Sequence, residues 1–210
     1  MTRTERRGKY DRSQTPEQRT ADRVEQLLDA ATEVFAERGF AATRVEDIVE
    51  RAGISRRTLY QHFDSVAAIL SEVYERAVRT SFATVVERLM GVTDPIDRIY
   101  AGVAAYYEMI AEHPHAARVV FEVYRHAGPA EAAKYELNTT RYALLLLEFL
   151  NAAHAARRLA RAPDETAVYA LTKGLEAVGM RALARREHGG LPAIAPRMAD
   201  LILDAFGATD

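Results

Sequence analysis

The sequence predicts an all-α protein of about nine helices, and three observations lead to that fold class. Apolar residues recur at positions i, i+3, i+4 and i+7 over most of the chain, which is the spacing of one helix face. No segment alternates apolar and polar residues for long enough to form a strand. Glycine and proline recur at intervals that would end one helix and begin the next.

The first helix has clear signals at both ends. Thr15 precedes Pro16 and is followed three residues later by Gln18, the pattern of a capping box with proline at the first helical position. Gly39 is the expected stop. The apolar stripe between them consists of Val24, Leu27, Leu28, Ala31, Val34 and Phe35. We therefore expect a long amphipathic helix that buries this stripe.

Two short helices follow, joined by a tight turn. A second capping box, Thr43 to Glu46, would begin a helix that buries Val45, Ile48 and Val49 and ends at Ala52-Gly53. Ile54 would fill the turn, and Ser55 would cap a third helix whose Leu59 and Phe63 face inward. Two short helices with this connection form a helix-turn-helix, the unit that places its second helix in the DNA major groove.

The remaining helices are bounded by the same kinds of signal. Asp64 or Ser65 would cap a long fourth helix that reaches about Met90. The later helices are expected from Asp94-Pro95 to His113-Pro114, from His115 to His126, from Gly128-Pro129 to about Arg161, from Pro163-Asp164 to before Gly189-Gly190, and from Pro196 onward. We thus expect a basic flexible arm at 1–15, a DNA-binding domain at 16–66, and a larger domain at 67–210. The arm either contacts DNA or is disordered without a function.

The exposed side of the third helix carries the side chains suited to reading DNA. At about 100° per residue, Arg56, Arg57, Tyr60 and Gln61 share one side, and Leu59 and Phe63 lie on the other. Arginine has the geometry to grip guanine through O6 and N7. The alternative for an arginine pair is a solvated face without a role, and Tyr60 alone would suggest packing.

Residues 20–70 resemble the TetR family of bacterial regulators. The resemblance rests on Phe35 to Phe40, Thr43, Val45 to Ile48, Ala52 to Ser55, and Thr58 to Phe63, and it covers about residues 20–70. It implies phosphate contacts for Thr43, Thr58, Tyr60 and His62 and base contacts for Arg56, Arg57 and Tyr60. Ser55, a cap first, can also touch phosphate. Family members often carry Gly at the position of Arg57 and Lys at that of Val66, and Arg44 would compensate for the missing Lys.

The C-terminal two-thirds matches the family in architecture alone, and its tyrosines suggest a ligand cavity. A tyrosine hydroxyl needs a partner when it is buried, so tyrosine is a costly choice for a dry core. The alternative is an ordinary core with aromatic residues at helical spacing. The predicted ligand-binding residues, for a mainly apolar and partly polar small-molecule effector, are Tyr107, Phe121, Tyr124, Tyr142, Phe149 and Tyr169.

The last two long helices predict a homodimer interface. Each carries an apolar stripe with no later element to cover it, and Gly174 and Gly179 would allow close helix approach. The expected contacts are Leu171, Leu175, Val178, Ile194, Met198, Leu201 and Ile202. Two helices from each subunit would form a four-helix bundle. The alternative is burial of these residues within one subunit.

Other classes of function find little support in the sequence. The net charge is −2 and there is no cysteine, no nucleophile motif, no phosphate-binding glycine loop and no zinc motif. His113, His115, His126 and His154 lack a metal-binding pattern. The apolar run at 142–147 is too short to span a membrane. We expect a cytoplasmic repressor, without cofactor or catalytic residues, that a small molecule releases from a palindromic double-stranded DNA operator. The alternatives are a DNA-architectural protein without an effector and a helical enzyme.

Overall fold

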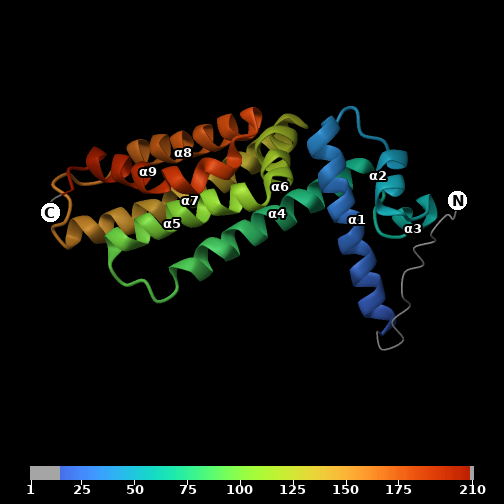
Figure 1. Ribbon diagram of the computed structural model, residues 1–210, viewed down its shortest axis with the longest axis horizontal. Coiled ribbons are helices and arrows are strands. Elements are labelled where there is room, and N and C mark those ends of the chain that lie inside the picture. The colour runs from blue at the N-terminus through green and yellow to red at the C-terminus, as the bar shows by residue number, and fades with distance from the viewer. Residues whose placement is uncertain (1–14, 209–210) are drawn as a thin grey trace, which may run out of the picture.

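The computed structural model describes residues 15–208 of the chain, and the regular elements in that range are helices (Figure 1). The α-helices are α1 Pro16–Arg38, α2 Val45–Ala52, α3 Arg56–Tyr60, α4 Val66–Leu89, α5 Pro95–Glu112, α6 Pro114–Arg118, α7 Pro129–Ala155, α8 Glu165–Arg185 and α9 Leu191–Ala205. The described part thus confirms the predicted all-α fold with nine α-helices. The predicted basic arm, apart from Thr15, lies outside the described residues.

Helix α1 begins and ends where the sequence predicts. The Thr15 hydroxyl accepts from the Gln18 amide at 3.2 Å, and the Gln18 side chain accepts from the Thr15 amide at 2.8 Å. The two bonds satisfy amide groups that a helix start otherwise leaves unpaired. Gly39 follows the helix with φ 75°, a conformation that favours glycine.

Helix α2 begins one residue later than the capping box at Thr43 predicted. The Thr43 hydroxyl donates to the Gly39 carbonyl at 2.7 Å and therefore does not cap the helix. The Asp47 carboxylate accepts from the Arg44 amide at 2.9 Å instead, and its other oxygen pairs with Arg38 at 2.6 Å. The predicted cap was wrong because the hydroxyl and the amide of Thr43 are both used in the preceding turn, where they donate to the Gly39 and Phe40 carbonyls.

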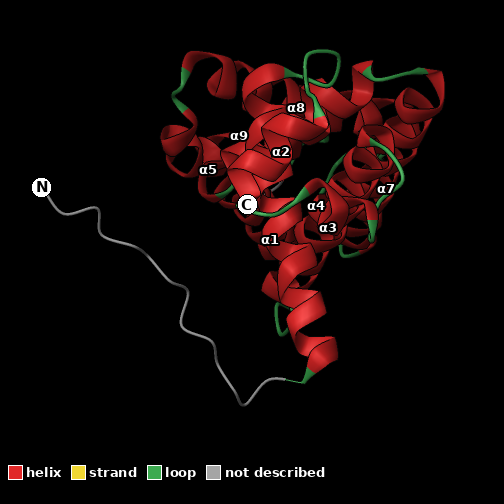
Figure 2. Cartoon of the chain, turned by 90° about the vertical axis from the view of Figure 1, so that its right-hand side faces the viewer, coloured by secondary structure: helices red, strands yellow, loops and turns green. Residues whose placement is uncertain are grey.

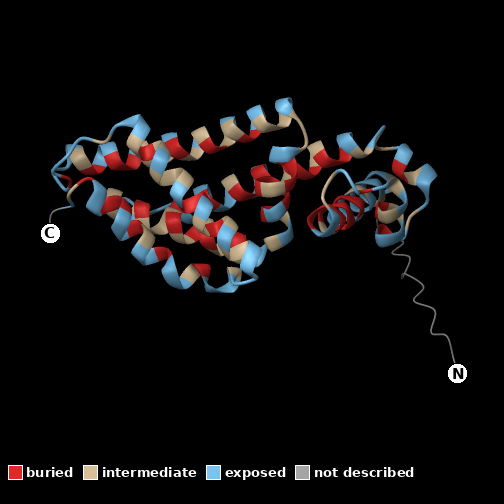
Figure 3. Ribbon diagram, turned by 90° about the horizontal axis from the view of Figure 1, so that it is seen from above, coloured by how far each residue is buried: buried red, intermediate tan, exposed pale blue. Residues whose placement is uncertain are grey.

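The predicted helix-turn-helix is present in the structure. Gly53 occupies the left-handed region at φ 65°, and the Ser55 hydroxyl accepts from the Thr58 amide at 3.1 Å. Ile48 of α2 and Leu59 of α3 are fully buried. The short α3 packs against α2, and its buried residue is Leu59, so most of α3 lies at the surface of this end of the molecule (Figure 3).

Helix α4 runs from this unit into a bundle made with α5, α7, α8 and α9 (Figures 1 and 2). Ser65 caps α4, with its hydroxyl accepting from the Ala68 amide at 3.1 Å. Helix α5 packs against α4, α7 and α9, and α7 packs against α8. No helix of the described part is long and apolar enough to cross a membrane.

Three expected boundaries in the bundle were wrong. The single helix expected from His115 to His126 is α6 followed by a π-helical turn, η1 Val119–Val123, and a 3₁₀ turn, η2 Tyr124–His126. Helix α7 ends at Ala155 because Arg157 takes the left-handed region and Leu159 pairs with Ala208. Helix α9 begins at Leu191 with Pro192 in its first turn, and Pro196 lies inside it.

Candidate DNA-reading surface and internal cavity

The outer side of α3 presents long polar side chains to solvent. Tyr60 is 53% exposed, although it is a large aromatic residue, and Arg56, Arg57 and Gln61 are exposed beside it. Ser55 and Arg44 are also exposed, at the starts of α3 and α2. The sequence predicts DNA contacts for these side chains, and all of them lie at the surface.

Ion pairs divide the arginines of this region into two groups. Arg51 pairs with Glu33 at 2.7 Å and with Glu37 at 2.8 Å, and these carboxylates raise the pKa of its guanidinium. Arg56 pairs with Glu46 of α2. Arg57 and Arg44 have no ion-pair partner among the described residues and are the cations most available to DNA.

The remaining predicted DNA contacts are less accessible. Thr43 is buried and its hydroxyl donates to Gly39, while Thr58 and His62 are half-buried. The Thr58 hydroxyl also lies 2.9 Å from that of Ser55. Each hydroxyl already has a partner within the protein but keeps acceptor capacity. Contacts of these residues with DNA stay a prediction.

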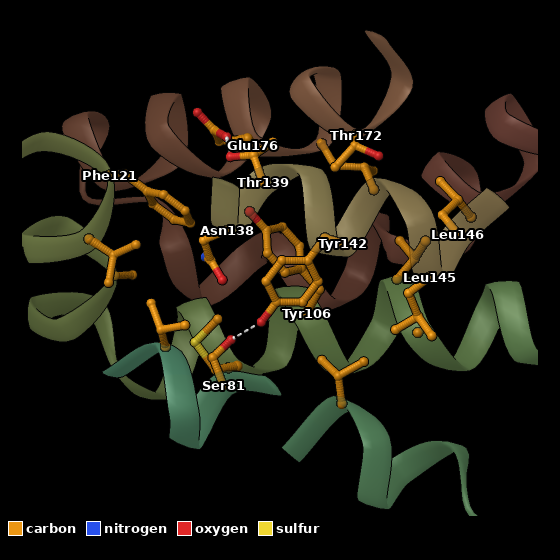
Figure 4. A pocket seen from close by; sticks show the side chains of 18 of the residues that line it. Ser81, Tyr106, Phe121, Asn138, Thr139, Tyr142, Leu145, Leu146, Thr172 and Glu176 are labelled. Atoms are coloured by element: carbon orange, nitrogen blue, oxygen red, sulfur yellow. Dashed lines mark hydrogen bonds between the residues drawn. The ribbon is translucent and has the colours of Figure 1, made fainter. Parts of the chain in front are cut away.

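A cavity lies between α4, α5, α6, η1, α7 and α8, and its walls are mainly apolar (Figure 4). The empty space at this site, including the open solvent at its mouth, is about 1000 Å³. Val78 and Val85 come from α4, Val103 from α5 and Leu145 and Leu146 from α7. Such a space suits an apolar ligand.

The structure brings half of the predicted ligand-binding residues to this cavity. Phe121, Tyr142 and Phe149 line it. Tyr107 is fully buried with its hydroxyl donating to the Leu175 carbonyl at 3.2 Å, and Tyr124 stacks on Tyr74 with ring centroids 3.7 Å apart. Tyr107 and Tyr124 therefore pack in the hydrophobic core.

Tyr169 lies elsewhere, in a groove between α7 and α8 that Ala143 and Leu144 also line. Tyr169 is half-buried there. Tyr107, Tyr124 and Tyr169 therefore do not line the cavity.

Polar residues that the sequence analysis did not single out also line the cavity. They are Ser81, Arg98, Tyr106, Tyr135, Asn138, Thr139, Thr172 and Glu176. The Ser81 and Tyr142 hydroxyls lie 2.7 Å apart across α4 and α7 (Figure 4). A signal in the sequence was Glu176, a charged residue next to Leu175 of the apolar stripe of α8.

Burial keeps the tyrosines of the cavity neutral. It raises the pKa of Tyr106 and Tyr142 above the ordinary tyrosine value. It also raises the pKa of Tyr135, and the Glu176 carboxylate beside that ring raises it further. At neutral pH these hydroxyls therefore keep their protons and can donate a hydrogen bond to a ligand.

The predicted dimer surface is only partly exposed in the single chain. Ile194 and Leu201 of α9 are exposed, at 38% and 54%, and Met198, Leu171 and Val178 are half-buried. Leu175 and Ile202 are buried within the protomer, and Leu175 lines the cavity. These two residues therefore cannot reach a partner. Gly179 is also internal, since a Cβ there would lie 2.9 Å from Ile110.

The cavity wall contacts the DNA-binding end directly. Helix α6 and η1 pack against α1 as well as α4. Ala117, Val120 and Phe121 of this segment line the cavity. One short segment thus contacts both the ligand space and the helix that supports α2 and α3.

The exposed recognition helix and its support define a helix-turn-helix DNA-binding protein. Residues 27–73 match the model of the family described as "Bacterial regulatory proteins, tetR family". The chain belongs to this TetR family.

Characterised relatives are consistent with that assignment. The chain is 33% identical over 144 residues to the HTH-type transcriptional activator FasR of Mycolicibacterium smegmatis, with 66% of each chain covered. It is 36% identical over 108 residues to the HTH-type transcriptional repressor KstR2 of the same organism, covering 51% of this chain and 52% of the relative. The chain thus matches about half to two-thirds of the length of these relatives.

Solved structures share the whole architecture. The fatty acid degradation regulator FadR from Bacillus halodurans superposes with a TM-score of 0.75 at 21% identity, covering 85% of this chain and 97% of that one. KstR2 of Mycobacterium tuberculosis gives 0.71 at 22% identity, covering 89% and 96%. FadR from Bacillus subtilis, in complex with stearoyl-CoA, gives 0.74 at 19%, covering 85% and 97%. At these identities the likeness shows the fold.

Proposed function

We propose that the protein is a homodimeric transcription repressor that a small, mainly apolar molecule releases from its DNA operator. The observation that carries this proposal concerns α4. Five residues separate this helix from α3, and it also lines the cavity. The chain therefore has a DNA-reading surface, a ligand space and a rigid element between them. Operator binding is the function that the exposed Arg57 and Tyr60 support.

The mechanism follows from the position of α4. Its residues Ala77, Ser81 and Val85 face the cavity, and its first turn directly follows the recognition unit. A ligand that pushes on α4 and on η1 changes the angle of α4 and moves α3. In a dimer the two recognition helices must meet successive major grooves about 34–36 Å apart, so a shift of a few ångströms weakens binding.

The dimer would form through the outer faces of α8 and α9. On α9 the exposed apolar residues are Ile194 and Leu201, one heptad apart. On α8 the exposed residues Ala170, Gly174 and Ala177 are small, which permits close approach of a partner helix. This surface replaces the buried Leu175 and Ile202 in the interface predicted from the sequence.

The cavity favours this function over a DNA-architectural protein, which needs no internal ligand space. Its mainly apolar wall, which includes Val78, Val85, Val103 and Leu146, also favours binding over catalysis. The relatives described above are named as regulators, FasR as an activator and KstR2 as a repressor. Repression follows from the mechanism described above. A ligand that changes the angle of α4 weakens DNA binding, so the operator is occupied when the ligand is absent.

Footprinting of the full-length protein on the DNA flanking its own gene tests the DNA-binding part. We expect protection of a palindromic sequence. If no sequence is protected better than bulk DNA, the proposal is contradicted. Stearoyl-CoA, found in the Bacillus subtilis FadR structure, is a first ligand to titrate. An effector must bind more weakly in the presence of operator, by the same factor by which it weakens operator binding. Equal ligand affinity with and without operator would contradict the switch.

A further inference from the structure

Several polar residues of the cavity lie at one end, around a buried carboxylate. Glu176 of α8 is 5% exposed, and the Thr139 hydroxyl of α7 donates to it at 3.4 Å. Its ammonium partner, Lys173, lies 3.2 Å away on the same helix and also pairs with Glu136 at 3.5 Å. A carboxylate at the wall of an apolar space is costly unless its oxygens accept hydrogen bonds. Glu176 has acceptor capacity beyond these two partners.

A further group at this end lacks a partner. The amide oxygen of Asn138 is buried and makes no hydrogen bond among the described residues. Asn138 lines the cavity at the same end as Thr139 and Glu176, and its amide points away from Glu176 in Figure 4. The Tyr135 hydroxyl lies beside the Glu176 carboxylate and is a donor. A buried polar atom without a partner is destabilising, so the Asn138 oxygen calls for a ligand group. With Glu176, this end offers two acceptor groups and suits a hydrogen-bond donor.

The opposite end holds a cation. Arg98 of α5 lines the cavity there, with its Nε donating to the Val92 carbonyl at 2.7 Å and its guanidinium 5.5 Å from the centre of the Phe149 ring. It has no carboxylate partner among the residues described. Ten residues of α7 separate Thr139 from Phe149, which is about 15 Å along the helix axis. The walls between the two ends are mainly apolar, with Leu145 and Leu146 among them (Figure 4).

We propose that the effector is an elongated hydroxy acid: a hydroxyl group donates to Glu176, an apolar body fills the cavity, and a carboxylate pairs with Arg98. This inference rests on the proposed function and specifies its ligand. A second carboxylate at the Glu176 end is excluded, because two buried like charges repel. A ligand without a hydroxyl leaves the acceptors of that end unsatisfied.

Three probes with one chain length test the assignment: palmitate, ω-hydroxypalmitate and hexadecanedioate. Calorimetric titration of the full chain is expected to show ω-hydroxypalmitate binding about tenfold more tightly than palmitate, equivalent to ~1.4 kcal/mol. Hexadecanedioate should bind more weakly than either. Equal affinities for palmitate and ω-hydroxypalmitate, or no binding of any probe, would overturn the proposal. Footprinting without ligand reports separately on the proposed function.

Variants assign the preference to residues. Glu176→Leu should abolish the preference for the hydroxyl, and Arg98→Met should weaken both monoacids equally and leave their ratio unchanged. Thr172→Val is the matched control, since the Thr172 hydroxyl lines the cavity but already donates to the Val168 carbonyl at 2.9 Å. Asn138→Leu, which keeps the Lys173–Glu176 pair, replaces Glu176→Leu if thermal unfolding shows that the latter does not fold. A preference that survives in the folded variant contradicts the assignment.

Discussion

The two ends of the molecule place their charged groups in opposite ways. Around α1 to α3 the core is apolar and closed, with Leu27, Phe35 and Ile48 fully buried, and the arginines stand outside. In the bundle, Glu176 and Arg98 line an internal space. The first end is built to present charge on its surface to a large partner, and the second to receive a small molecule inside. The same family fold therefore combines a filled core with an open one.

The largest expected effect links the two ends through the dimer. Replacing Ile194 and Leu201 together by Asp should give soluble monomers in sedimentation, because charges on the outer face of α9 prevent its burial. Operator affinity should then fall by about 10²–10⁴-fold, since linkage of the two half-sites is lost. Leu137→Asp with Leu144→Asp is the matched control, because these leucines of α7 are also exposed, at 64% and 52%. If the control dissociates and the α9 variant does not, the interface lies on α7.

Truncating one leucine to alanine in each region tests the difference between the closed core around α1 and the open core of the bundle. Leu27→Ala, in the filled core of α1, should lower the free energy of unfolding by about 2–5 kcal/mol. Leu146→Ala, at the cavity wall, should cost less than about 2 kcal/mol, because its side chain already lacks neighbours on one side. Chemical denaturation measures both. Equal losses would mean that the cavity is filled by packing in solution.

The next effect separates the two groups of arginines at the DNA-binding end. Arg57→Ala should weaken operator binding by ~1–3 kcal/mol and relax the base preference, since a good base contact has that value. Its thermal stability should be unchanged, because Arg57 makes no ion pair among the described residues. Arg51→Ala, which removes the pairs with Glu33 and Glu37, should leave the base preference intact. A shift assay with operator variants decides, and unaltered preference in Arg57→Ala would show that it reads no base.

The sequence predicted the DNA-binding end better than the cavity, and the reason is the range of the interactions. Thr15 and Ser55 bond within three residues, so local patterns suffice to predict those helix starts. At Thr43 the hydroxyl donates back to the Gly39 carbonyl instead of capping the helix, and the prediction failed by one residue. The fold class and the order of the helices followed from helical spacing and from the glycine and proline positions.

The cavity depends on contacts between distant helices. Tyr106 and Tyr107 are neighbours on α5, yet only Tyr106 lines the cavity. Helical spacing separates the directions of two adjacent residues but does not tell which direction faces an open space. Tyr169 fails for the same reason, because its groove arises only when α7 packs on α8. On α9 the outward-facing residues belong to the predicted stripe. On α8, however, Leu175 is buried, which shows that an apolar stripe can face the interior of the protein as well as a partner.

The smallest effect uses two glycines to ask whether a partner covers α8. Gly102 of α5 and Gly174 of α8 lie inside helices, and a Cβ at either would meet nothing within 4 Å in the single chain. Alanine at each should therefore stabilise the protomer by about 0.5–1 kcal/mol, since glycine has the lower helix propensity. If α8 packs closely on a partner helix, Gly174→Ala adds a methyl group to that contact and weakens the dimer, while Gly102→Ala does not. Sedimentation over a dilution series, combined with thermal unfolding, separates the two contributions. A Gly174→Ala dimer as tight as that of Gly102→Ala would show that the face around Gly174 is not in close contact with the partner.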